Sequence, residues 1–578
     1  MKSETPVFVN QDKWNESMRE FIPKSILYFR SGYNGAKFRK DLLAGVTVGI
    51  IALPLAMAFA IASGVAPERG LFTAIIAGFL ISALGGSRVQ IGGPTGAFVV
   101  IVYDIIQRTG YEGLAISTMI AAILLVIMGL LRLGTWIKYI PHPLITGFTT
   151  GIAVLIFSSQ IKDFFGLNMG PPPASFIAKW SAYFDAFPTL DLTTFALGAG
   201  TLGLILSIRR FAPIIPWGIA AIVGATLCAY FFHLPVETIQ SKFGSLPRNL
   251  PLPSLPFFSI PEGKLAEIFT DAITIAFLGA IESLLSAVIA DGMIGGRHKS
   301  NCELVGQGIA NFASILFGGI PATGAIARTA ANIKTGAQTP ASGMIHAITL
   351  FFILLFLAPL VSRIPLAALA AILIMVSWNM SEISHFIRLL QAPFADTVVL
   401  LTAFLLTVLV DITVAISLGM VLACLLFMKR MGDSSKTVSL THLFDEPSGE
   451  FPERSDPDAI SHKKVPKGVE VYEIQGPFFF GAADMLKDLM SDLKPLPKIF
   501  ILRMRHVPMI DASGMHALKE FYEKCAKEKT VLYLSGVHGQ TEKDLKQFGL
   551  SKSIGENHIF SNFDAALRNA SSHLNLSE

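Results

Sequence analysis

Two stretches of the chain, more than two hundred residues apart, carry the same unusual combination of Gly, Pro and Thr. Residues 90–99 read QIGGPTGAFV, and residues 318–328 read GGIPATGAIAR. In each stretch a Gly-Gly pair and a proline interrupt regular helix, and Thr-Gly-Ala then leads into apolar residues. We therefore expect each stretch to be an extended segment followed by a short helix.

Two such short helices would form an anion site if their N-termini met. A helix N-terminus carries about half a positive charge and several free N–H groups, so an anion can bind there without many basic side chains. Thr95 and Thr323 would add hydroxyl groups, and Gly96 and Gly324 would let the backbone approach the ligand. Interrupted segments at matching positions of two halves are typical of a transporter site. For either stretch alone, tight helix packing at the glycines is the alternative.

Two charged residues lie in apolar sequence near the second stretch. Glu282 is the only charged residue between Ala272 and Ala290. A carboxylate inside a membrane helix is costly, so it suggests a function, such as carrying a coupling proton or helping to hold a cation. Arg328, early in the second short helix, could face a bound anion or pair with Glu282. The structural alternatives are a glutamate hydrogen-bonded within the bundle and an arginine that extends to the membrane interface.

The C-terminal part contains a third candidate. Residues 507–518 read VPMIDASGMHAL, in which a strand ends at a turn and a helix begins near Ser513. Phosphate on Ser513 would place negative charge at a helix N-terminus, where it is favoured. The alternative is that Ser513 is a plain helix N-cap.

Composition identifies the elements that must hold these residues. The chain has 578 residues, of which 52% are hydrophobic and 15% charged, whereas a soluble domain has about 25% charged residues. Apolar runs extend from about residue 42 to residue 428 and ordinary charged sequence follows, which indicates a membrane domain followed by a soluble domain. The expected spans are 42–63, 71–85, 113–131, 144–161, 192–208 and 214–232, then 266–290, 304–317, 340–361, 364–379, 394–411 and 413–428.

The two short helices raise the number of segments to seven in each half. Thr95 and Thr323 lie 228 positions apart, and the same offset aligns residues 50–60 with residues 277–287. We therefore expect two repeats of opposite orientation. Under this count, one membrane face carries all the basic clusters, so the positive-inside rule places that face and both termini in the cytoplasm. These clusters lie at 37–41, 87–90, 132–138, 209–210, 295–299 and 429–430.

The C-terminal part changes period. Runs rich in β-branched and aromatic residues at 469–476, 498–507 and 530–537 alternate with helical stretches at 482–492 and 515–527, which predicts a small α/β domain. The expected organisation is a cytoplasmic segment (1–36), a transport domain (37–432, with repeats at about 37–235 and 262–432), a linker (433–466) and the α/β domain (467–572).

Several classes of function are disfavoured. The net charge of +4 gives no reason to expect a nucleic-acid partner. The four cysteines are scattered, so neither a disulfide framework nor a zinc site is indicated, and we expect no metal or cofactor. No Ser-His-Asp set or metal-ligand spacing indicates an enzyme.

Three longer motifs resemble one family. LPLAMAFAIASGVAPERGLFTA (53–74), GAIESLLSAVIADGMIGGRHKSNCELVGQGIAN (279–311) and ARTAANIKTGAQTP (327–340) are similar to motifs of the SulP sulfate-permease family of anion transporters. The similarity extends over roughly residues 35–570 and is greatest to bacterial members that move C4-dicarboxylates. It implies fourteen α-helical segments in two inverted seven-helix repeats, with a core domain that moves against a gate domain like an elevator. It further implies a homodimer and a cytoplasmic α/β STAS domain at the C-terminus.

The resemblance also implies residue roles. It makes Glu282 the coupling residue, and proton coupling is favoured over sodium because a sodium-coupled member has Asp at this position. Ser513 matches a serine that is phosphorylated in related anti-sigma-factor antagonists, which suggests a cytoplasmic protein partner for the STAS domain. The substrate-binding residues implied are Phe59, Thr95, Gly96, Ala97, Ala325, Ile326, Ala327 and Arg328.

The expected function is therefore secondary active transport of a small anion, of the sulfate, C4-dicarboxylate or bicarbonate class. The protein is expected in the lipid of a bacterial inner membrane, as a proton symporter with a regulatory STAS tail. The alternatives are a passive anion channel and an anion sensor whose output is the STAS domain. A carboxylate buried beside the site favours coupled transport, because a channel has no use for it.

Overall fold

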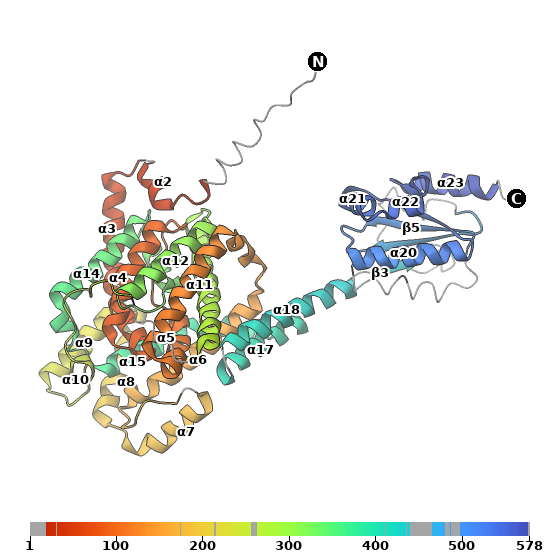
Figure 1. Ribbon diagram of the computed structural model, residues 1–578. Helices are drawn as coiled ribbons and strands as arrows, with labels where there is room; N and C mark the ends of the chain where they lie inside the picture. Colours follow the sequence, from red (N-terminus) through yellow and green to blue (C-terminus); the bar gives the residue numbers. More distant parts are fainter. Residues whose placement is uncertain are drawn as a thin grey trace. The chain divides into compact units, whose positions relative to one another are not determined.

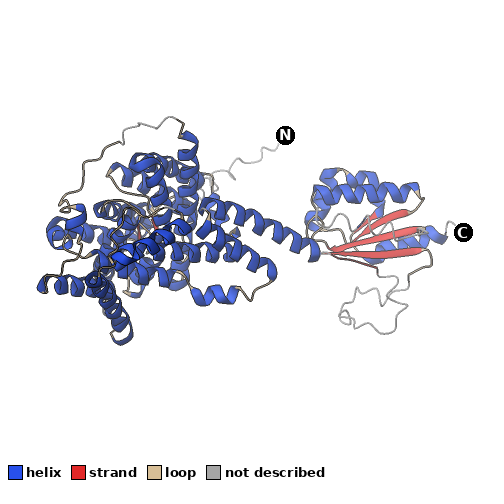
Figure 2. Cartoon of the chain, turned by 90° about the horizontal axis from the view of Figure 1, so that it is seen from below, coloured by secondary structure: helices blue, strands red, loops and turns tan. Residues whose placement is uncertain are grey.

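The computed structural model describes residues 19–30, 32–173, 175–212, 216–255, 263–410, 412–434, 436–439, 465–479, 486 and 497–575. The chain divides into two compact units, Met1–Met420 and Val421–Glu578. The first is almost entirely helical, and the second combines a sheet with helices (Figures 1 and 2). Each unit is described by itself.

The helices of the first unit match the expected spans. Nine helices among the described residues are long and apolar enough to cross a membrane, and α9 and α17 are shorter apolar helices. The first half contains α3 (Gly35–Ala62), α4 (Pro67–Leu84), α5 (Gly96–Leu130), α6 (His142–Phe165), α8 (Leu192–Phe211) and α9 (Trp217–Phe231). The second half contains α11 (Leu265–Ile294), α12 (Ser300–Leu316), α13 (Ile326–Lys334), α14 (Ala341–Val361), α15 (Leu366–Met380), α17 (Phe394–Leu409) and α18 (Ile412–Ser434).

Helix α5 is two segments joined at a glycine. Gly110 has φ 70° and ψ −173°, which interrupts the helix between a short first part and a longer second part. Such a φ is strained for residues with a side chain and is readily adopted by glycine. With α5 counted as two, each half has seven segments, as the sequence predicts. Shorter helices flank them: α2 (Lys24–Arg30), α7 (Phe176–Ala186), α10 (Ile239–Phe243) and α16 (Ile383–Leu389).

The segments pack as two groups, each with helices from both halves. The core group contains α3, α4, α5, α11, α12, α13 and α14, in which α5 packs against α11 and α12, and α14 packs against α3 and α4. The gate group contains α6, α8, α9, α15, α17 and the part of α18 up to Met420, where the first unit ends, and α6 packs against α15 and α17. Fewer contacts join the groups, mainly those of α5 with α6 and of α3 with α15.

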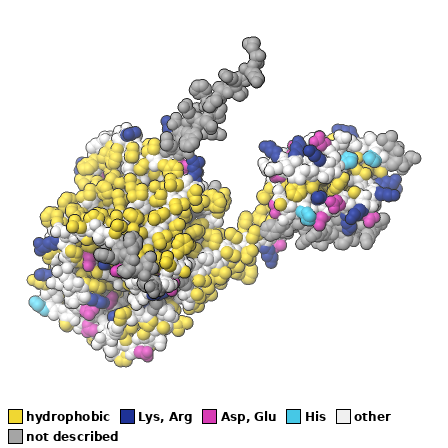
Figure 3. All heavy atoms as spheres, in the orientation of Figure 1, with side chains coloured by type: hydrophobic (Ala, Val, Ile, Leu, Met, Phe, Trp, Pro, Cys, Tyr) yellow, Lys and Arg dark blue, Asp and Glu magenta, His cyan; other side chains and the backbone are white. Residues whose placement is uncertain are grey.

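The outer surface of the helical unit is apolar. Hydrophobic side chains cover most of its visible face, whereas charged side chains are mixed over the visible face of the second unit (Figure 3). Large exposed side chains on the long helices include Phe352 and Phe356 of α14. A bilayer covers such a surface in a membrane-embedded protein.

The second unit is a five-stranded sheet with helices. Its strand order is β3-β4-β5-β6-β7, with β3 antiparallel to β4 and the other neighbours parallel. One apolar cluster includes residues of α20, α21 and α22, and another includes residues of α23. The strands are β3 (Lys436–Ser439), β4 (Val469–Gln475), β5 (Ile499–His506), β6 (Val531–Ser535) and β7 (Ile559–Phe560), and the helices are α20 (Ala512–Lys527), α21 (Gly539–Phe548), α22 (Leu550–Ile554) and α23 (Phe563–Asn575).

The α/β prediction is confirmed at three strands and one helix. Strands β4, β5 and β6 fall within the three predicted runs, and α20 contains the predicted helical stretch 515–527. Strand β3 lies in the segment expected as a linker, where too few apolar residues alternate to indicate a strand. The predicted helical stretch 482–492 lies outside the described residues except for Leu486.

Candidate functional site

The two Gly-Pro-Thr stretches pair with each other inside the core group. Strand β1 (Gly92–Gly93) is antiparallel to β2 (Thr323–Gly324), with Gly92 opposite Gly324 and Gly93 opposite Thr323. The Ala325 N–H also donates to the Ile91 carbonyl at 2.8 Å. Helix α5 starts three residues after β1, and α13 starts two residues after β2. The pairing therefore brings the two helix N-termini together, as predicted, with opposite chain directions.

Helix α11 holds this pair in place through serine hydroxyls. A hydrogen bond joins Ser283 Oγ and Thr323 Oγ1 at 2.7 Å, and the Gly324 N–H donates to Ser283 Oγ at 3.2 Å. One turn further, Ser286 Oγ donates to Thr329 Oγ1 at 3.2 Å, and the same threonine oxygen accepts from the Ile91 N–H at 3.0 Å. The Thr323 hydroxyl is thus hydrogen-bonded to α11, whereas the sequence led us to expect this hydroxyl to contact the ligand.

Arg328 connects the two stretches. Its side chain is only 3% exposed, and Nη2 donates to the Pro94 carbonyl, directly before Thr95, the N-cap residue of α5. No ion pair joins Arg328 to Glu282 among the described residues, and the arginine does not extend to the interface. The Arg328 guanidinium, which comes from the second repeat, therefore lies at the N-terminus of α5, whose first part is the short helix of the first repeat.

Several buried polar atoms around the pair have no partner. In the described part of the chain, Thr95 Oγ1, Arg328 Nη1 and both amide atoms of Gln90 are buried without a hydrogen bond. An unsatisfied buried polar group costs about 1–3 kcal/mol, so such groups are expected to meet a ligand or water. Their donors are mostly cationic or neutral N–H and O–H groups, which suit an anion.

Gln90 was not selected from the sequence. It is 4% exposed, and its amide lies where a side chain at Gly324 would be, since a Cβ there would be 1.8 Å from Gln90 Nε2. The available signal was its position two residues before the first Gly-Gly pair, as the one amide residue of the stretch 90–99. Only the pairing of the two stretches places it beside the second half-helix.

The two matched glycines have different surroundings. A Cβ at Gly96 would lie 3.0 Å from Ile156 Cδ1, 3.3 Å from Met380 Sδ and 3.5 Å from Phe59 Cε1. Ile156 and Met380 belong to the gate group, so the side of Gly96 on which a Cβ would lie, here called its open side, faces the boundary between the groups. The open side of Gly324 instead faces Gln90 and the α11 backbone within the core group. The expectation that both glycines face a ligand stays a prediction, and the structure opens only Gly96 toward the gate group.

The other residues implied by resemblance are only partly gathered. Phe59, Ala97 and Ala325 are buried at the half-helices, with Phe59 against Gly96 and Ala325 as the N-cap residue of α13. Ile326 is half-buried and Ala327 is exposed.

Glu282 lies on α11 beside Ser283. Its side chain is 6% exposed, and no hydrogen bond or ion pair to it is present within the described residues. The structural alternative, a glutamate hydrogen-bonded into the bundle, is therefore not what the structure shows. A buried carboxyl group without a fixed partner is free to exchange a proton or accept a cation.

In the second unit, Ser513 is exposed in the first turn of α20. The N-cap is Asp511, whose Oδ1 accepts from the Gly514 N–H at 2.8 Å. The alternative that Ser513 caps the helix is therefore wrong. Asp and Ser are equally good cap residues, and the sequence Asp-Ala-Ser-Gly does not show which one is used.

Comparison with known proteins agrees with this architecture. The Sulfate permease family matches residues 38–403, and the STAS domain matches residues 462–566. The chain is 41% identical over 537 residues to the putative sulfate transporter YvdB of Bacillus subtilis, which covers 92% of this chain and 98% of that protein. It is 30% identical over 547 residues to the bicarbonate transporter BicA of Picosynechococcus sp., which covers 92% of this chain and 94% of that protein.

A solved structure shows the same fold over almost the whole chain. The inward-facing structure of murine Solute Carrier 26 family member A9 aligns with a TM-score of 0.84 at 16% identity, covering 99% of this chain and 96% of that chain. The paired half-helices, the two packing groups and the family matches together identify the chain as a member of the sulfate permease family of anion transporters, a multi-pass membrane protein with a C-terminal STAS domain.

Proposed function

We propose that the protein is a secondary active transporter that binds a small anion between the N-termini of α5 and α13. The observation that carries the proposal is the cluster of unsatisfied buried atoms, Thr95 Oγ1, Gln90 and Arg328 Nη1, at two paired helix N-termini. Helix dipoles, free N–H groups and one guanidinium make this place favourable for negative charge. Sulfate, bicarbonate and C4-dicarboxylates are the substrate classes that fit.

The contacts of Gly96 support movement of one group against the other. Its open side meets Ile156 and Met380 of the gate group, so a bound anion would lie at the boundary between the groups. Sliding of the core group along this boundary would carry the anion across the membrane without dismantling the paired stretches. The two packing groups are the rigid bodies that such an elevator requires.

Glu282 supplies the coupling in this proposal. Because it is buried on the helix that anchors β2, its charge is felt at the anion site. Protonation of Glu282 would remove a negative charge close to the anion, so anion binding and proton binding would favour each other. This coupling is symport with a proton, and sodium is the less favoured coupling ion.

The remaining features complete the proposal. Residues 37–432 form the transport domain and residues 467–572 the STAS domain, with 433–466 as the linker. The protein acts as a homodimer in the inner membrane with both termini in the cytoplasm. There the STAS domain meets a protein partner, and phosphorylation of the exposed Ser513 alters that contact.

Uptake by the purified full-length protein in proteoliposomes tests the function. Radiolabelled sulfate, bicarbonate and succinate are compared with and without an inward proton gradient, and a protonophore is the control. Accumulation of one anion above equilibrium, lost with the protonophore, supports the proposal. Uptake that only equilibrates indicates a channel. Normal binding without uptake, together with loss of any response in a chain truncated after Ser434, indicates a sensor.

A further inference from the structure

A cavity of about 510 Å³ lies in the helical unit and reaches the first Gly-Pro-Thr stretch only at its last residue, Val99. It is lined at the C-terminal end of α3 by Ile61 and Ala62, and at the first part of α5 by Val99 and Val100. It therefore opens toward the membrane face on which α3 ends, the face opposite to the predicted cytoplasmic one. Its volume is in the range of small-molecule sites, and the half-helix residues Phe59 and Gly96 do not line it.

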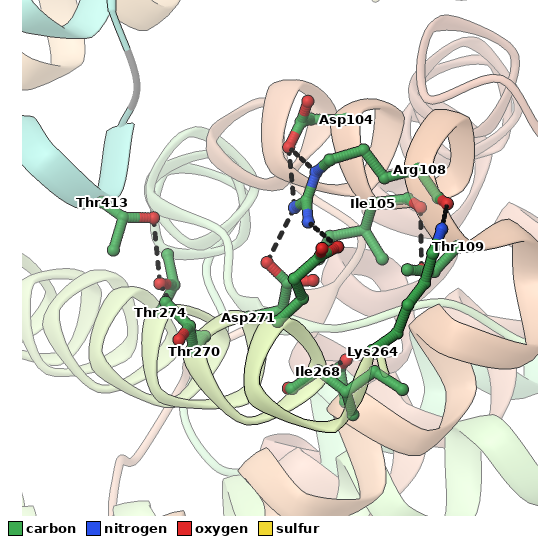
Figure 4. Close-up of polar contacts among 12 residues, drawn as sticks. Asp104, Ile105, Arg108, Thr109, Lys264, Ile268, Thr270, Asp271, Thr274 and Thr413 are labelled. Carbon is green, nitrogen blue, oxygen red and sulfur yellow. Dashed lines mark hydrogen bonds and ion pairs between the residues drawn. The ribbon is translucent and has the colours of Figure 1, made fainter. Parts of the chain in front are cut away.

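The core-group side of the cavity is acidic, but its carboxylates are bound to one arginine. Arg108 contacts Asp104 at 2.8 Å, Asp271 at 2.8 Å and Glu267 at 3.4 Å. Figure 4 shows the Arg108 guanidinium between Asp104 and Asp271, with Lys264 bound to the Arg108 backbone carbonyl. Asp104, Arg108 and Asp271 line the cavity, and on this wall a single guanidinium is shared among three carboxylates.

The opposite wall carries lysines, two of which have no carboxylate of the described residues within ion-pair distance. Lys242 pairs with Asp163 at 2.9 Å and with Glu237 at 3.8 Å. Lys162 of α6 donates only to the Gly170 carbonyl, at 3.1 Å, in the described part of the chain. Lys179 of α7 has no hydrogen bond or ion pair there, although it is only 6% exposed. Both unpaired lysines line the cavity.

The Lys179 ammonium is aimed into the cavity. Nζ lies 5.5 Å from the centre of the Tyr103 ring, and Tyr103 lines the same cavity. The Tyr103 hydroxyl donates to the Pro172 carbonyl at 2.6 Å, so it does not satisfy the lysine. Burial lowers the pKa of Lys179 because desolvation disfavours its ammonium form. A neighbouring anion would offset that cost.

We propose that this cavity is a second anion site, a vestibule in which Lys162 and Lys179 bind a small dianion of the sulfate type. The site rests on the proposed transport function, for which it concentrates substrate on one membrane face. Two ammonium groups without carboxylate partners match two negative charges, while Lys242 is neutralised by Asp163. The Gln160 amide nearby is occupied, since it donates to Ile156 O at 3.2 Å and to Ser159 Oγ at 2.6 Å. The two lysines are therefore the cationic groups proposed to bind the ligand.

Sulfate binding to the full-length protein in nanodiscs tests the vestibule. Calorimetry compares wild type with Lys179→Met, Lys162→Met and the charge-retaining Lys179→Arg. Lys264→Met is the matched control, because it removes a lysine that lies beside the acidic wall and does not line the cavity. Lys179→Met and Lys162→Met each lose charge-assisted contacts, so in these two variants we expect one class of sulfate site to weaken about tenfold or more. Lys179→Arg and Lys264→Met are expected to bind as wild type does.

Transport measurements separate this proposal from the proposed function. In proteoliposomes, Lys179→Met should raise the KM for sulfate or delay its saturation while Vmax stays close to wild type. The vestibule is overturned if Lys179→Met and Lys162→Met both bind sulfate with wild-type affinity while size-exclusion chromatography shows that they are correctly folded. If the wild-type protein shows no uptake but its sulfate binding still depends on Lys179, the transport function is overturned and the vestibule stands. If Lys264→Met weakens sulfate binding as much as Lys179→Met does, the effect is one of general charge, and the vestibule is overturned.

Discussion

The matched glycines Gly96 and Gly324 should respond in opposite ways to the same small substitution. Each follows the threonine of its stretch, GGPTG at 92–96 and GGIPATG at 318–324, so the sequence predicts equivalent roles for the two glycines. In the structure, an added methyl group at Gly324 would be 1.8 Å from Gln90 Nε2 and 3.2 Å from Ser283 Cα. At Gly96 the nearest atoms are Ile156 Cδ1 at 3.0 Å and Met380 Sδ at 3.3 Å, which are the ends of flexible side chains.

These contacts set the expected magnitudes. Gln90 is 4% exposed and has little room to move, so Gly324→Ala overpacks the core group. Such overpacking costs about 1–3 kcal/mol of unfolding free energy. Gly96→Ala requires shifts of a few tenths of an ångström in two side chains, so its cost is expected to be well below that of Gly324→Ala. Its methyl group would instead occupy the proposed anion position and weaken anion binding.

Two measurements on full-length protein check this pair. Thermal unfolding in detergent should show a clear fall in melting temperature for Gly324→Ala and little change for Gly96→Ala. Substrate binding, measured at a temperature where both variants are folded, should be reduced in Gly96→Ala. The reasoning is refuted if Gly324→Ala melts as wild type does, or if Gly96→Ala is destabilised as strongly and binds the anion normally.

Three further results are expected. Glu282→Gln should abolish proton-driven accumulation but keep some anion binding, and normal pH-driven accumulation would contradict its role. Asp511→Ala should lower the unfolding free energy of the STAS unit by about 1 kcal/mol, because it removes the α20 cap, whereas Ser513→Ala should leave it nearly unchanged; hydrogen exchange of α20 measures both. Ser513→Asp should change the uptake rate without unfolding the unit, and unaltered uptake would exclude a phosphorylation switch. Burial raises the pKa of the Cys525 thiol to about 12, so at pH 8 the thiol stays protonated and N-ethylmaleimide should label it slowly in folded protein and rapidly after unfolding.

The fold could largely be predicted from the sequence, because the signals are local. A bilayer requires long apolar helices, and each of these was visible as an apolar run. The strands of the second unit were visible as short β-branched runs, although β3 was not, since its four residues gain their place only by pairing with β4. The repeated stretch also determined that two half-helices would meet, because inverted repeats bring equivalent segments together.

The composition of the site was decided by tertiary structure. The partner of Arg328 is the Pro94 carbonyl, 234 positions earlier in the chain, and nothing in the local sequence selects it over Glu282. Gly96 and Gly324 look alike in the sequence but differ because one faces the gate group and the other faces Gln90. The two lysines proposed to bind the anion come from helices α6 and α7, and the acidic wall comes from α5 and α11. The sequence determined which helices are interrupted and which segments repeat, since backbone propensity and hydropathy are local. Packing between distant helices decided which polar groups remain unpaired, and therefore where an anion can bind.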